Sequence, residues 1–205
     1  CGIIASCLTL NPARLYWPTA TALALIMIAS LLDSQSTSLT RPDQLMLSQF
    51  LLGFGSAFFL APAMLAGIGG VIADQRNLVS FSVLFGMSQN IGGLLGSAIL
   101  GTFQTWREKF HSSQLADQIT TLNPLINDRL QQYLQQYQSQ IGDSALLNVQ
   151  ANTLLQTAST LEANILAYND TYLLTAAISA ATLLWVFWRL LRLRITAHVA
   201  LKRAT

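Results

Sequence analysis

The sequence predicts an all-α fold: a multi-pass transmembrane helical bundle with a helical external loop. Hydrophobic residues make up 52% of the 205 residues and charged residues only 10%, whereas soluble chains average about 25% charged. The mean hydropathy is +0.46. The apolar residues are gathered in long uncharged runs, and each complete run reaches roughly the 20 residues that a bilayer requires. A soluble globular protein with so few charges would expose large apolar patches to water.

Composition and motifs also exclude several classes of protein. The formal net charge is only +2, from 11 Lys and Arg against 9 Asp and Glu, so no nucleic-acid partner is indicated. Cys1 and Cys7 lie in one apolar stretch without CxxC spacing, which favours neither a disulfide framework nor a zinc site. Residues 67–70, Gly-Ile-Gly-Gly, have no following Lys-Ser/Thr and so do not form a phosphate loop. We expect neither an enzyme nor a bound metal.

The apolar runs define one partial span and four complete ones. Residues 3–10 are too short to cross a bilayer. Because the chain opens inside this run without a Met, we expect it to be the C-terminal piece of a longer protein. Segment 33–43 is polar and rich in Ser and Thr, so we expect a loop there. The complete spans are uncharged and bounded by polar or charged residues: 16–32, 45–73, 78–105 and 171–188.

A Gln-rich segment with helical patterning separates the last two spans. One apolar stripe follows Asn123-Pro124, a helix start with Pro in the first position. Its members recur at spacings of four and three: Ile126, Leu130, Tyr133, Tyr137 and Ile141. A second stripe has heptad spacing: Leu147, Ala151, Leu154, Ala158, Leu161, Ile165, Tyr168 and Tyr172. We predict one long helix from Ser144 to about Arg189 that packs through this second stripe.

These segments divide the chain into four regions, and their charges predict its orientation. Residues 1–105 hold the end of one span and three further spans, and 106–169 form an external or periplasmic helical loop. Residues 170–190 form the last transmembrane helix, and 191–205 form a basic tail. One side of the membrane receives seven Lys and Arg, and the other receives four. The positive-inside rule therefore places the C-terminus in the cytoplasm.

Small residues recur within two of the spans. Gly92 and Gly96 form a GxxxG motif, and such ladders let helix backbones approach closely in lipid. We therefore predict a tight helix–helix contact in this span. In the preceding span, Pro62 removes one backbone hydrogen bond and permits a kink. The residues assigned to packing or kinking are Gly53, Gly55, Pro62, Gly92, Gly93, Gly96 and Gly101.

The order of these motifs resembles a known family. A G-x-G…Pro span, a short loop with Gln75-Arg76, and a GGxxG span ending in Trp106-Arg107-Glu108 come first. A long polar loop with His111 and Asn123-Pro124, then one last span, complete the series. This order resembles the C-terminal part of the fourteen-span drug:proton antiporters of the major facilitator superfamily, the EmrB/QacA-like branch. The resemblance covers nearly the whole chain. Where that family commonly has an Arg before the GG pair, this chain has Gln89.

The resemblance implies part of the C-terminal half of a major-facilitator exporter in the inner membrane of a bacterial cell. Its activity would be proton-coupled multidrug efflux, and hence antibiotic resistance, by alternating access around a midplane site. The proton gradient would supply the energy, with no other cofactor, and the substrate would be an amphipathic small molecule. The spans carry no Asp, Glu, Lys, Arg or His in their interiors. We therefore expect the proton-carrying carboxylate to lie upstream of Cys1.

Two sets of residues are candidates for the substrate pathway, and each has a simpler alternative. Gln89 or Asn90 faces the pathway, or else makes an interhelical hydrogen bond worth about 0.6 kcal/mol on average. Phe58, Phe59 and Met64 line a cavity for apolar cations, or else contact lipid and neighbouring helices. The sequence leaves both alternatives open.

The external loop also has two interpretations. It covers the outer mouth of the transporter, or it docks a periplasmic membrane-fusion adaptor and, through it, an outer-membrane channel, as the resemblance implies for double-membraned bacteria. An alternative function from another class is a non-transporting membrane scaffold whose external helical hairpin recruits a partner. Sequence upstream of Cys1 would discriminate these functions, since further spans with a buried carboxylate favour transport.

Overall fold

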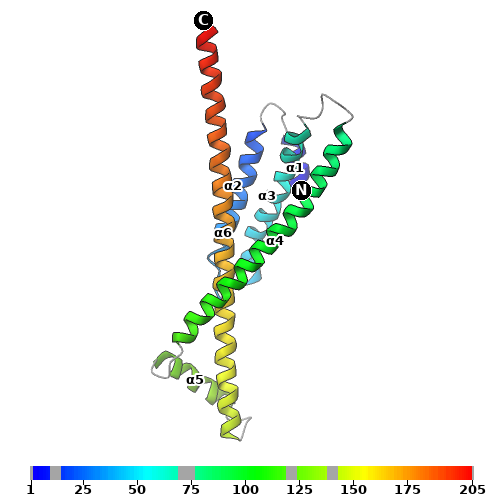
Figure 1. Ribbon diagram of the computed structural model, residues 1–205. Coiled ribbons are helices and arrows are strands. Elements are labelled where there is room, and N and C mark those ends of the chain that lie inside the picture. The colour runs from blue at the N-terminus through cyan, green and yellow to red at the C-terminus, as the bar shows by residue number, and fades with distance from the viewer. Residues whose placement is uncertain (1, 10–14, 69–76, 119–123, 138–142, 205) are drawn as a thin grey trace. The chain divides into compact units, whose positions relative to one another are not determined.

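The computed structural model describes residues 2–9, 15–68, 77–118, 124–137 and 143–204. Within these ranges every regular element is a helix, which confirms the predicted all-α fold (Figure 1). The helices are α1 (Gly2–Thr9), α2 (Tyr16–Asp33), α3 (Pro42–Ile68), α4 (Asn77–Gln118), α5 (Pro124–Tyr137) and α6 (Ser144–Ala204).

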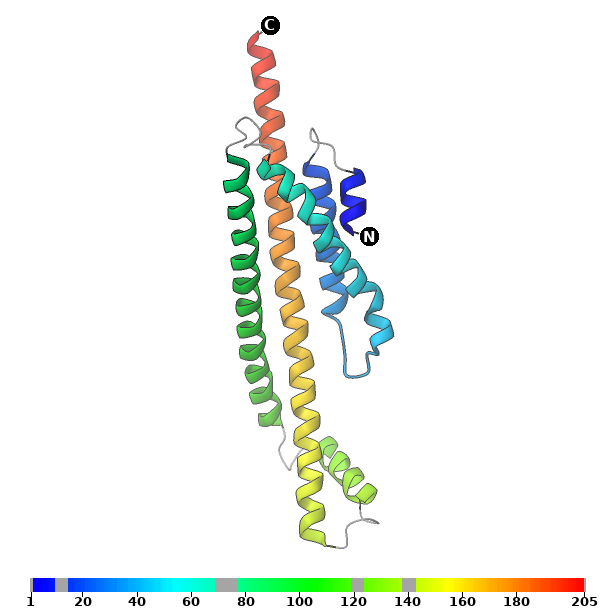
Figure 2. The same ribbon diagram turned by 90° about the vertical axis from the view of Figure 1, so that its right-hand side faces the viewer.

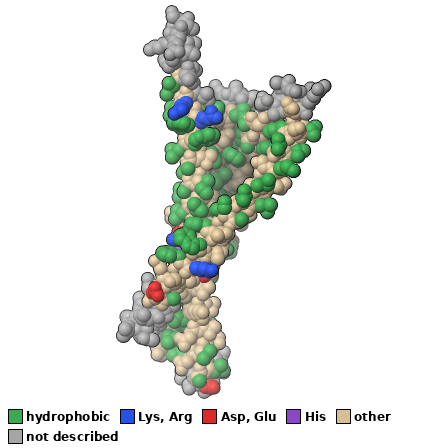
Figure 3. Space-filling view, viewed as in Figure 1, with side chains coloured by type: hydrophobic (Ala, Val, Ile, Leu, Met, Phe, Trp, Pro, Cys, Tyr) green, Lys and Arg blue, Asp and Glu red, His purple; other side chains and the backbone are tan. Residues whose placement is uncertain are grey.

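Four of the described helices are long and apolar enough to cross a membrane, as the sequence predicts. The segments are Tyr16–Asp33, Pro42–Ile68, Asn77–Asp117 and Ala145–Arg192. They are α2, α3, α4 without its last residue, and α6 from its second residue to Arg192. Hydrophobic side chains gather along the visible face of α4 (Figure 3). Because a soluble fold would cover such a face, the chain is a helical membrane protein.

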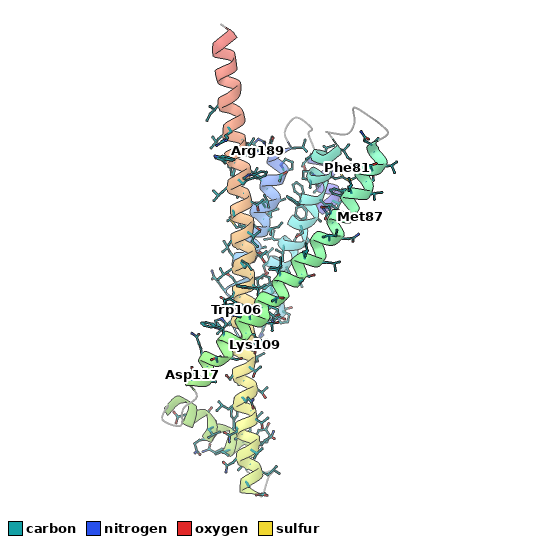
Figure 4. All side chains as sticks on the ribbon, viewed as in Figure 1. Phe81, Met87, Trp106, Lys109, Asp117 and Arg189 are labelled. Atoms are coloured by element: carbon teal, nitrogen blue, oxygen red, sulfur yellow. The ribbon has the colours of Figure 1, made fainter. Side chains whose placement is uncertain are left out.

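Two helices continue beyond their apolar stretches. Helix α4 passes without a break from the apolar run into the polar segment and ends at Gln118. Figure 4 labels Trp106, Lys109 and Asp117 on this continuation. Helix α6 runs from Ser144 to Ala204, so the predicted long helix is confirmed and includes most of the basic tail.

Local capping explains where two of the helices begin. Helix α3 starts with Pro42, whose missing N–H costs nothing in a first turn. The Gln44 side chain reaches back and accepts a hydrogen bond from the Arg41 backbone N–H at 3.1 Å. At the start of α6, the Asp143 carboxylate accepts a hydrogen bond from the Ala145 backbone N–H at 2.9 Å. An acidic cap also complements the positive end of the helix dipole.

The helices form two compact units, which we describe separately. The first, called the apolar unit, comprises Cys1–Gln35, Thr40–Ala98 and Tyr172–Thr205. The second, called the polar unit, comprises Ser36–Leu39 and Ile99–Thr171. Helices α4 and α6 each contribute residues to both units.

In the apolar unit, α1 and α2 both pack against α3 (Figures 1 and 2). Glycines make both approaches possible. A Cβ added at Gly2 would lie 2.8 Å from the Phe54 carbonyl oxygen, so any side chain there would push α1 away from α3. A Cβ added at Gly55 would lie 3.2 Å from the Ala22 carbonyl oxygen of α2. Close approach at small residues is the usual way in which helices associate in lipid.

Pro62 lies inside α3, and its side chain is fully buried. Because proline has no backbone N–H, the Phe58 carbonyl four residues earlier loses its helical donor. The Ser6 hydroxyl of α1 donates a hydrogen bond to this carbonyl oxygen at 2.9 Å. Ser6 is completely buried, so the bond forms away from water. The proline thus creates an acceptor that fixes α1 on α3.

In the polar unit, α5 lies beside the N-terminal part of α6 in both ribbon views (Figures 1 and 2). The predicted stripe of α5 is the covered side, since Leu130, Tyr133 and Tyr137 are half-buried. The opposite side is exposed: Asp128, Gln131, Gln132, Gln135 and Gln136. Ile141, the last member of the predicted stripe, lies outside the described residues, and the side chain of Ile126, its first member, is likewise not described.

Packing of α6 through its predicted heptad stripe stays a prediction. Of its members, Ala151 is buried, Leu147, Leu154, Ile165 and Tyr172 are half-buried, Ala158 is exposed, and Leu161 and Tyr168 are 56% and 53% exposed. The buried residues in this part of α6 are alanines: Ala151, which belongs to the predicted stripe, and Ala163 and Ala167, which do not. These positions are separated by multiples of four residues, so they follow a single i±4 row of the helix surface. Small side chains at these positions let a neighbouring part of the chain approach closely.

Candidate functional site: a buried carboxylate and an ion cluster

The residues predicted for the substrate pathway lie on α3 and α4. Phe58 is 8% exposed and stacks on Phe54 with ring centroids 5.8 Å apart, while Phe59 is half-buried. Met64 is 43% exposed. Gln89 and Asn90 are exposed on α4, and neither makes a side-chain hydrogen bond within the described part of the chain. The assignment of all five residues to a substrate pathway stays a prediction.

The residues predicted for packing or kinking divide into two groups. In the first group, Gly55 makes the close contact with α2, and Pro62 is buried within α3. Cβ atoms added at the other glycines would meet no described atom within 4 Å: Gly53, Gly92, Gly93, Gly96 and Gly101. The tight contact predicted for the GxxxG motif is therefore not made within the described residues, and it stays a prediction.

The buried carboxylate of the apolar unit is Asp33. The sequence predicts a loop beginning at this residue, but the structure makes Asp33 the last residue of α2 and buries it completely. The correction has a tertiary cause. Helix α3 brings two polar donors to the carboxylate: Ser48 donates its hydroxyl proton to Oδ1, and Gln49 Nε2 donates to Oδ2 at 2.7 Å. These two hydrogen bonds replace those that water would make to an exposed carboxylate.

The same cluster reaches a third helix through Gln49. The Gln49 Nε2 atom also lies 3.1 Å from the hydroxyl of Tyr172 on α6. An amide nitrogen carries two protons, so it can donate to Asp33 and Tyr172 together. Asp33 is fully buried whereas Gln49 is exposed. We call Asp33, Ser48, Gln49 and Tyr172 the carboxylate cluster, and it extends from the interior of the unit to its surface.

Ser30 adds a further buried hydroxyl one turn before Asp33. Residues three apart on a helix share a face, so Ser30 and Asp33 are neighbours on α2. Ser30 is 0% exposed, and its Oγ has no hydrogen-bond partner among the described residues. An unsatisfied buried hydroxyl costs free energy, and such groups in native proteins commonly mark a site for water or for function.

The polar unit contains an ion cluster centred on Asp170. Its Oδ2 atom lies 2.6 Å from Arg107 Nε and 2.6 Å from His111 Nε2. The three side chains are 23%, 23% and 14% exposed, for Asp170, Arg107 and His111 respectively. The Arg107 guanidinium also lies over the Phe110 ring, 4.8 Å from its centroid. The cluster thus joins α4 to α6 through charge-assisted hydrogen bonds.

A neighbouring hydrogen bond extends this attachment. Asn169 Nδ2 donates a hydrogen bond to the Ser36 carbonyl oxygen at 2.7 Å, and this bond attaches α6 to the short segment Ser36–Leu39.

A surface pocket of about 500 Å³ lies between α4 and α6, further from Asp170 along both helices. Its lining is mostly uncharged and polar: Ser112, Ala116, Asn152, Leu155, Gln156, Ser159 and Thr160. Among the described residues, no three His, Cys, Asp or Glu side chains are grouped as metal ligands.

Sequence reasoning missed both Asp33 and the Arg107–His111–Asp170 cluster. The signal for Asp33 was its position directly after an apolar run, combined with Ser48 and Gln49 one turn into the next span. The signal for the ion cluster was the i, i+4 spacing of Arg107 and His111, which places both side chains on one face of a helix. Neither spacing identifies its partner, because each partner lies on a different helix.

Comparison with known proteins gives one match. No protein-family model matches the sequence, and no solved structure matches it. The chain is 24% identical over 172 residues to the MFS-type transporter YhcA of Bacillus subtilis. The alignment covers 77% of this chain but 30% of YhcA, so the chain spans under a third of that relative. The likeness therefore shows only that this chain, which contains four helices apolar enough to cross a membrane, is similar to part of an MFS-type transporter.

Proposed function

We propose that the chain is part of a secondary active transporter that exports amphipathic small molecules in exchange for protons. The observation that carries this proposal is the likeness to an MFS-type transporter across 77% of the chain. The carboxylate cluster adds a chemical reason, since ionisable groups held in membrane helices are costly and usually functional. Assignment to the EmrB/QacA-like branch rests on the order of sequence motifs.

The proposed orientation has the C-terminus in the cytoplasm of the cell and residues 106–169 outside. The excess of Lys and Arg on the C-terminal side supports it. At that end of α6, the Arg189 guanidinium lies 5.5 Å from the Trp185 ring centroid, and Arg192 lies 3.9 Å from that of Trp188. Aromatic and basic residues together are typical of the membrane–water interface. A periplasm-active reporter fused after Thr205 should be inactive.

Transport can be tested with the full-length protein in inside-out membrane vesicles. Respiration acidifies the vesicle interior, and a pH-sensitive dye reports the gradient. Adding ethidium, an amphipathic cation, should dissipate part of the gradient, because each exported cation is exchanged for protons. Vesicles without the protein are the control. If ethidium and a panel of other amphipathic cations neither move protons nor accumulate, proton-coupled efflux is wrong.

A second candidate function is a membrane scaffold, and one observation favours it. The polar unit leaves large apolar side chains of α6 exposed: Leu146, Val149, Leu161 and Tyr168. Such side chains suit docking of a periplasmic adaptor, which would also serve an exporter. Cysteine pairs across α5 and α6, such as Leu134→Cys with Leu154→Cys, separate the two interpretations of the external loop. Crosslinking within one chain at one of several registers supports a hairpin that covers the outer mouth, whereas crosslinks only to another protein support docking.

A further inference from the structure

The geometry points to Asp33 as a proton-carrying carboxylate of the transporter, with Ser48 and Gln49 as the groups that accommodate both of its charge states. The inference rests on the proposed function, because a proton carrier has a role only if transport is coupled to protons. It also replaces the expectation that the carrier must lie upstream of Cys1.

The first argument is the place of Asp33 in the fold. It is completely buried, and it is the last residue of a helix long and apolar enough to span the membrane. The carbonyl end of a helix carries a partial negative charge, so this position does not favour a negative side chain. A carboxylate kept there against both burial and the helix dipole needs a reason, and reversible protonation relieves both costs.

The second argument is that Ser48 can serve either state of the carboxylate. Its hydroxyl lies within hydrogen-bond distance of two acceptors, the Asp33 carboxylate and the Leu45 carbonyl oxygen, the latter at 2.9 Å. One hydroxyl proton can serve only one acceptor at a time. When Asp33 is ionised, Ser48 donates to it. When Asp33 is protonated, Ser48 can turn its proton to Leu45 and accept the new O–H bond.

Gln49 supplies the connection to the surface. Its amide donates to Asp33 at 2.7 Å while its side chain is exposed, so water that contacts Gln49 lies one residue from the buried carboxylate. Ser30 provides a buried hydroxyl with spare hydrogen-bonding capacity one turn away on α2. Tyr172 is the titratable group on α6, and its contact is with Gln49. The charged groups at the start of α3, Arg41 and Asp43, are exposed.

These contacts describe a balanced proton transfer. A hydronium ion on the Gln49 side transfers one proton to an Asp33 carboxylate oxygen, which becomes a neutral carboxylic acid, and the hydronium ion becomes water. In a later step the acid transfers the same proton to a water molecule, and the carboxylate is restored. No bond other than O–H forms or breaks, and no further reactant is needed.

The test uses the full-length protein in the same vesicles, with Asp33→Asn as the main variant. Asparagine copies the protonated acid in shape but cannot exchange a proton. We expect at least about tenfold less ethidium-induced proton release, with exchange of labelled for unlabelled ethidium retained, because exchange needs no net proton movement. Asp43→Asn removes an exposed carboxylate in the first turn of α3 and should behave as the wild type.

Each outcome separates the inference from the proposed function. If the wild-type protein releases no protons, the proposed function fails before Asp33 is tested. If Asp33→Asn releases protons as the wild type does, Asp33 is not the carrier. Loss of both coupling and exchange in a folded variant shows that Asp33 is structural and also overturns the inference.

A second variant keeps the test decisive if Asp33→Asn does not fold. Ser48→Ala leaves the carboxylate in place but removes one donor from its ionised form. We expect the pH of half-maximal coupled transport to rise by about one unit, which corresponds to one charge-assisted hydrogen bond. An unchanged pH profile would argue against proton binding at Asp33.

Discussion

Asp33 and Asp170 are both carboxylates that join helices, but the two units surround them differently. In the apolar unit, Asp33 is completely buried and accepts hydrogen bonds from a neutral hydroxyl and a neutral amide. In the polar unit, Asp170 is 23% exposed and lies 2.6 Å from both Arg107 and His111. Basic partners stabilise the charge of Asp170, whereas the hydroxyl of Ser48 and the amide of Gln49 that donate to Asp33 are neutral.

The same contrast extends to how each unit is held together. The apolar unit depends on close backbone approach at Gly2 and Gly55. The polar unit depends on long side chains that meet at Asp170. Close approach in the apolar unit tolerates no added volume, whereas an ion cluster tolerates volume but responds to charge and salt. Substitutions should therefore affect the two units through different properties.

The largest effect is expected from Gly55→Leu. Its Cβ alone would lie 3.1 Å from Ile26 Cγ1 and 3.2 Å from the Ala22 carbonyl oxygen, so a leucine must push α2 and α3 apart. Overpacking of this kind costs about 1–3 kcal/mol. The measurement is thermal unfolding of the detergent-solubilised full-length protein. Gly53→Leu is the matched control in the same helix, since a Cβ there meets nothing within 4 Å. Equal destabilisation by both variants would contradict the contact.

Next in size is Asp170→Asn in the polar unit. Removing the charge leaves Arg107 and His111 with a weaker acceptor, at a cost of about 1–2 kcal/mol after allowing for partial exposure. The same unfolding measurement in low and high salt should show the difference from wild type shrinking as salt rises. Asp117→Asn, which alters an exposed carboxylate of α4, is the control. A loss that does not depend on salt would indicate packing rather than charge.

Ser6→Ala should have a smaller effect of about 1 kcal/mol, because one neutral hydrogen bond is lost and the Phe58 carbonyl is left without that donor. This loss should not depend on salt, which distinguishes it from the effect of Asp170→Asn. Repeating the substitution in a Pro62→Ala background tests the cause. Alanine restores the helical N–H to the carbonyl, so Ser6→Ala should then cost little. An unchanged cost would mean that Ser6 acts by packing alone.

The smallest effect is expected from Asp143→Ala at the start of α6. The variant removes the acceptor of the Ala145 N–H and an acidic group at the positive end of the helix, worth about 0.5–1 kcal/mol. Amide hydrogen exchange should increase in the first turn of α6 and remain unchanged near Asp170. If exchange increased along the whole helix, the Asp143 cap would stabilise all of α6 and not only its first turn.

Much of the fold can be predicted from the sequence, because membrane spans are local. Uncharged runs of sufficient length identify the spanning parts of α2, α3, α4 and α6, and Pro124 marks the start of α5. The covered side of α5 follows from its spacing of four and three. These features depend on residues close together in one helix, so no knowledge of tertiary contacts is required.

The candidate site could not be predicted, because its residues are assembled from different helices. Asp33 follows an apolar run and precedes polar residues, which is also how a loop residue looks in a sequence. Only the arrival of Ser48 and Gln49 from α3 makes burial of the carboxylate possible. The burial of Ala163 and Ala167 on α6 could not be predicted for a related reason. A heptad pattern selects apolar residues by their spacing and does not show where a small side chain lets another part of the chain approach.

The bond between Ser6 and the Phe58 carbonyl also has a consequence for how such sequences diverge. Pro62 and Ser6 lie 56 positions apart, yet the need for a hydroxyl at one position exists only while a proline occupies the other. A lineage that replaced the proline would release the serine from selection, whereas a lineage that lost the serine first would carry a destabilised helix pair. Descendants of this sequence should therefore lose the two residues in a fixed historical order, proline before serine.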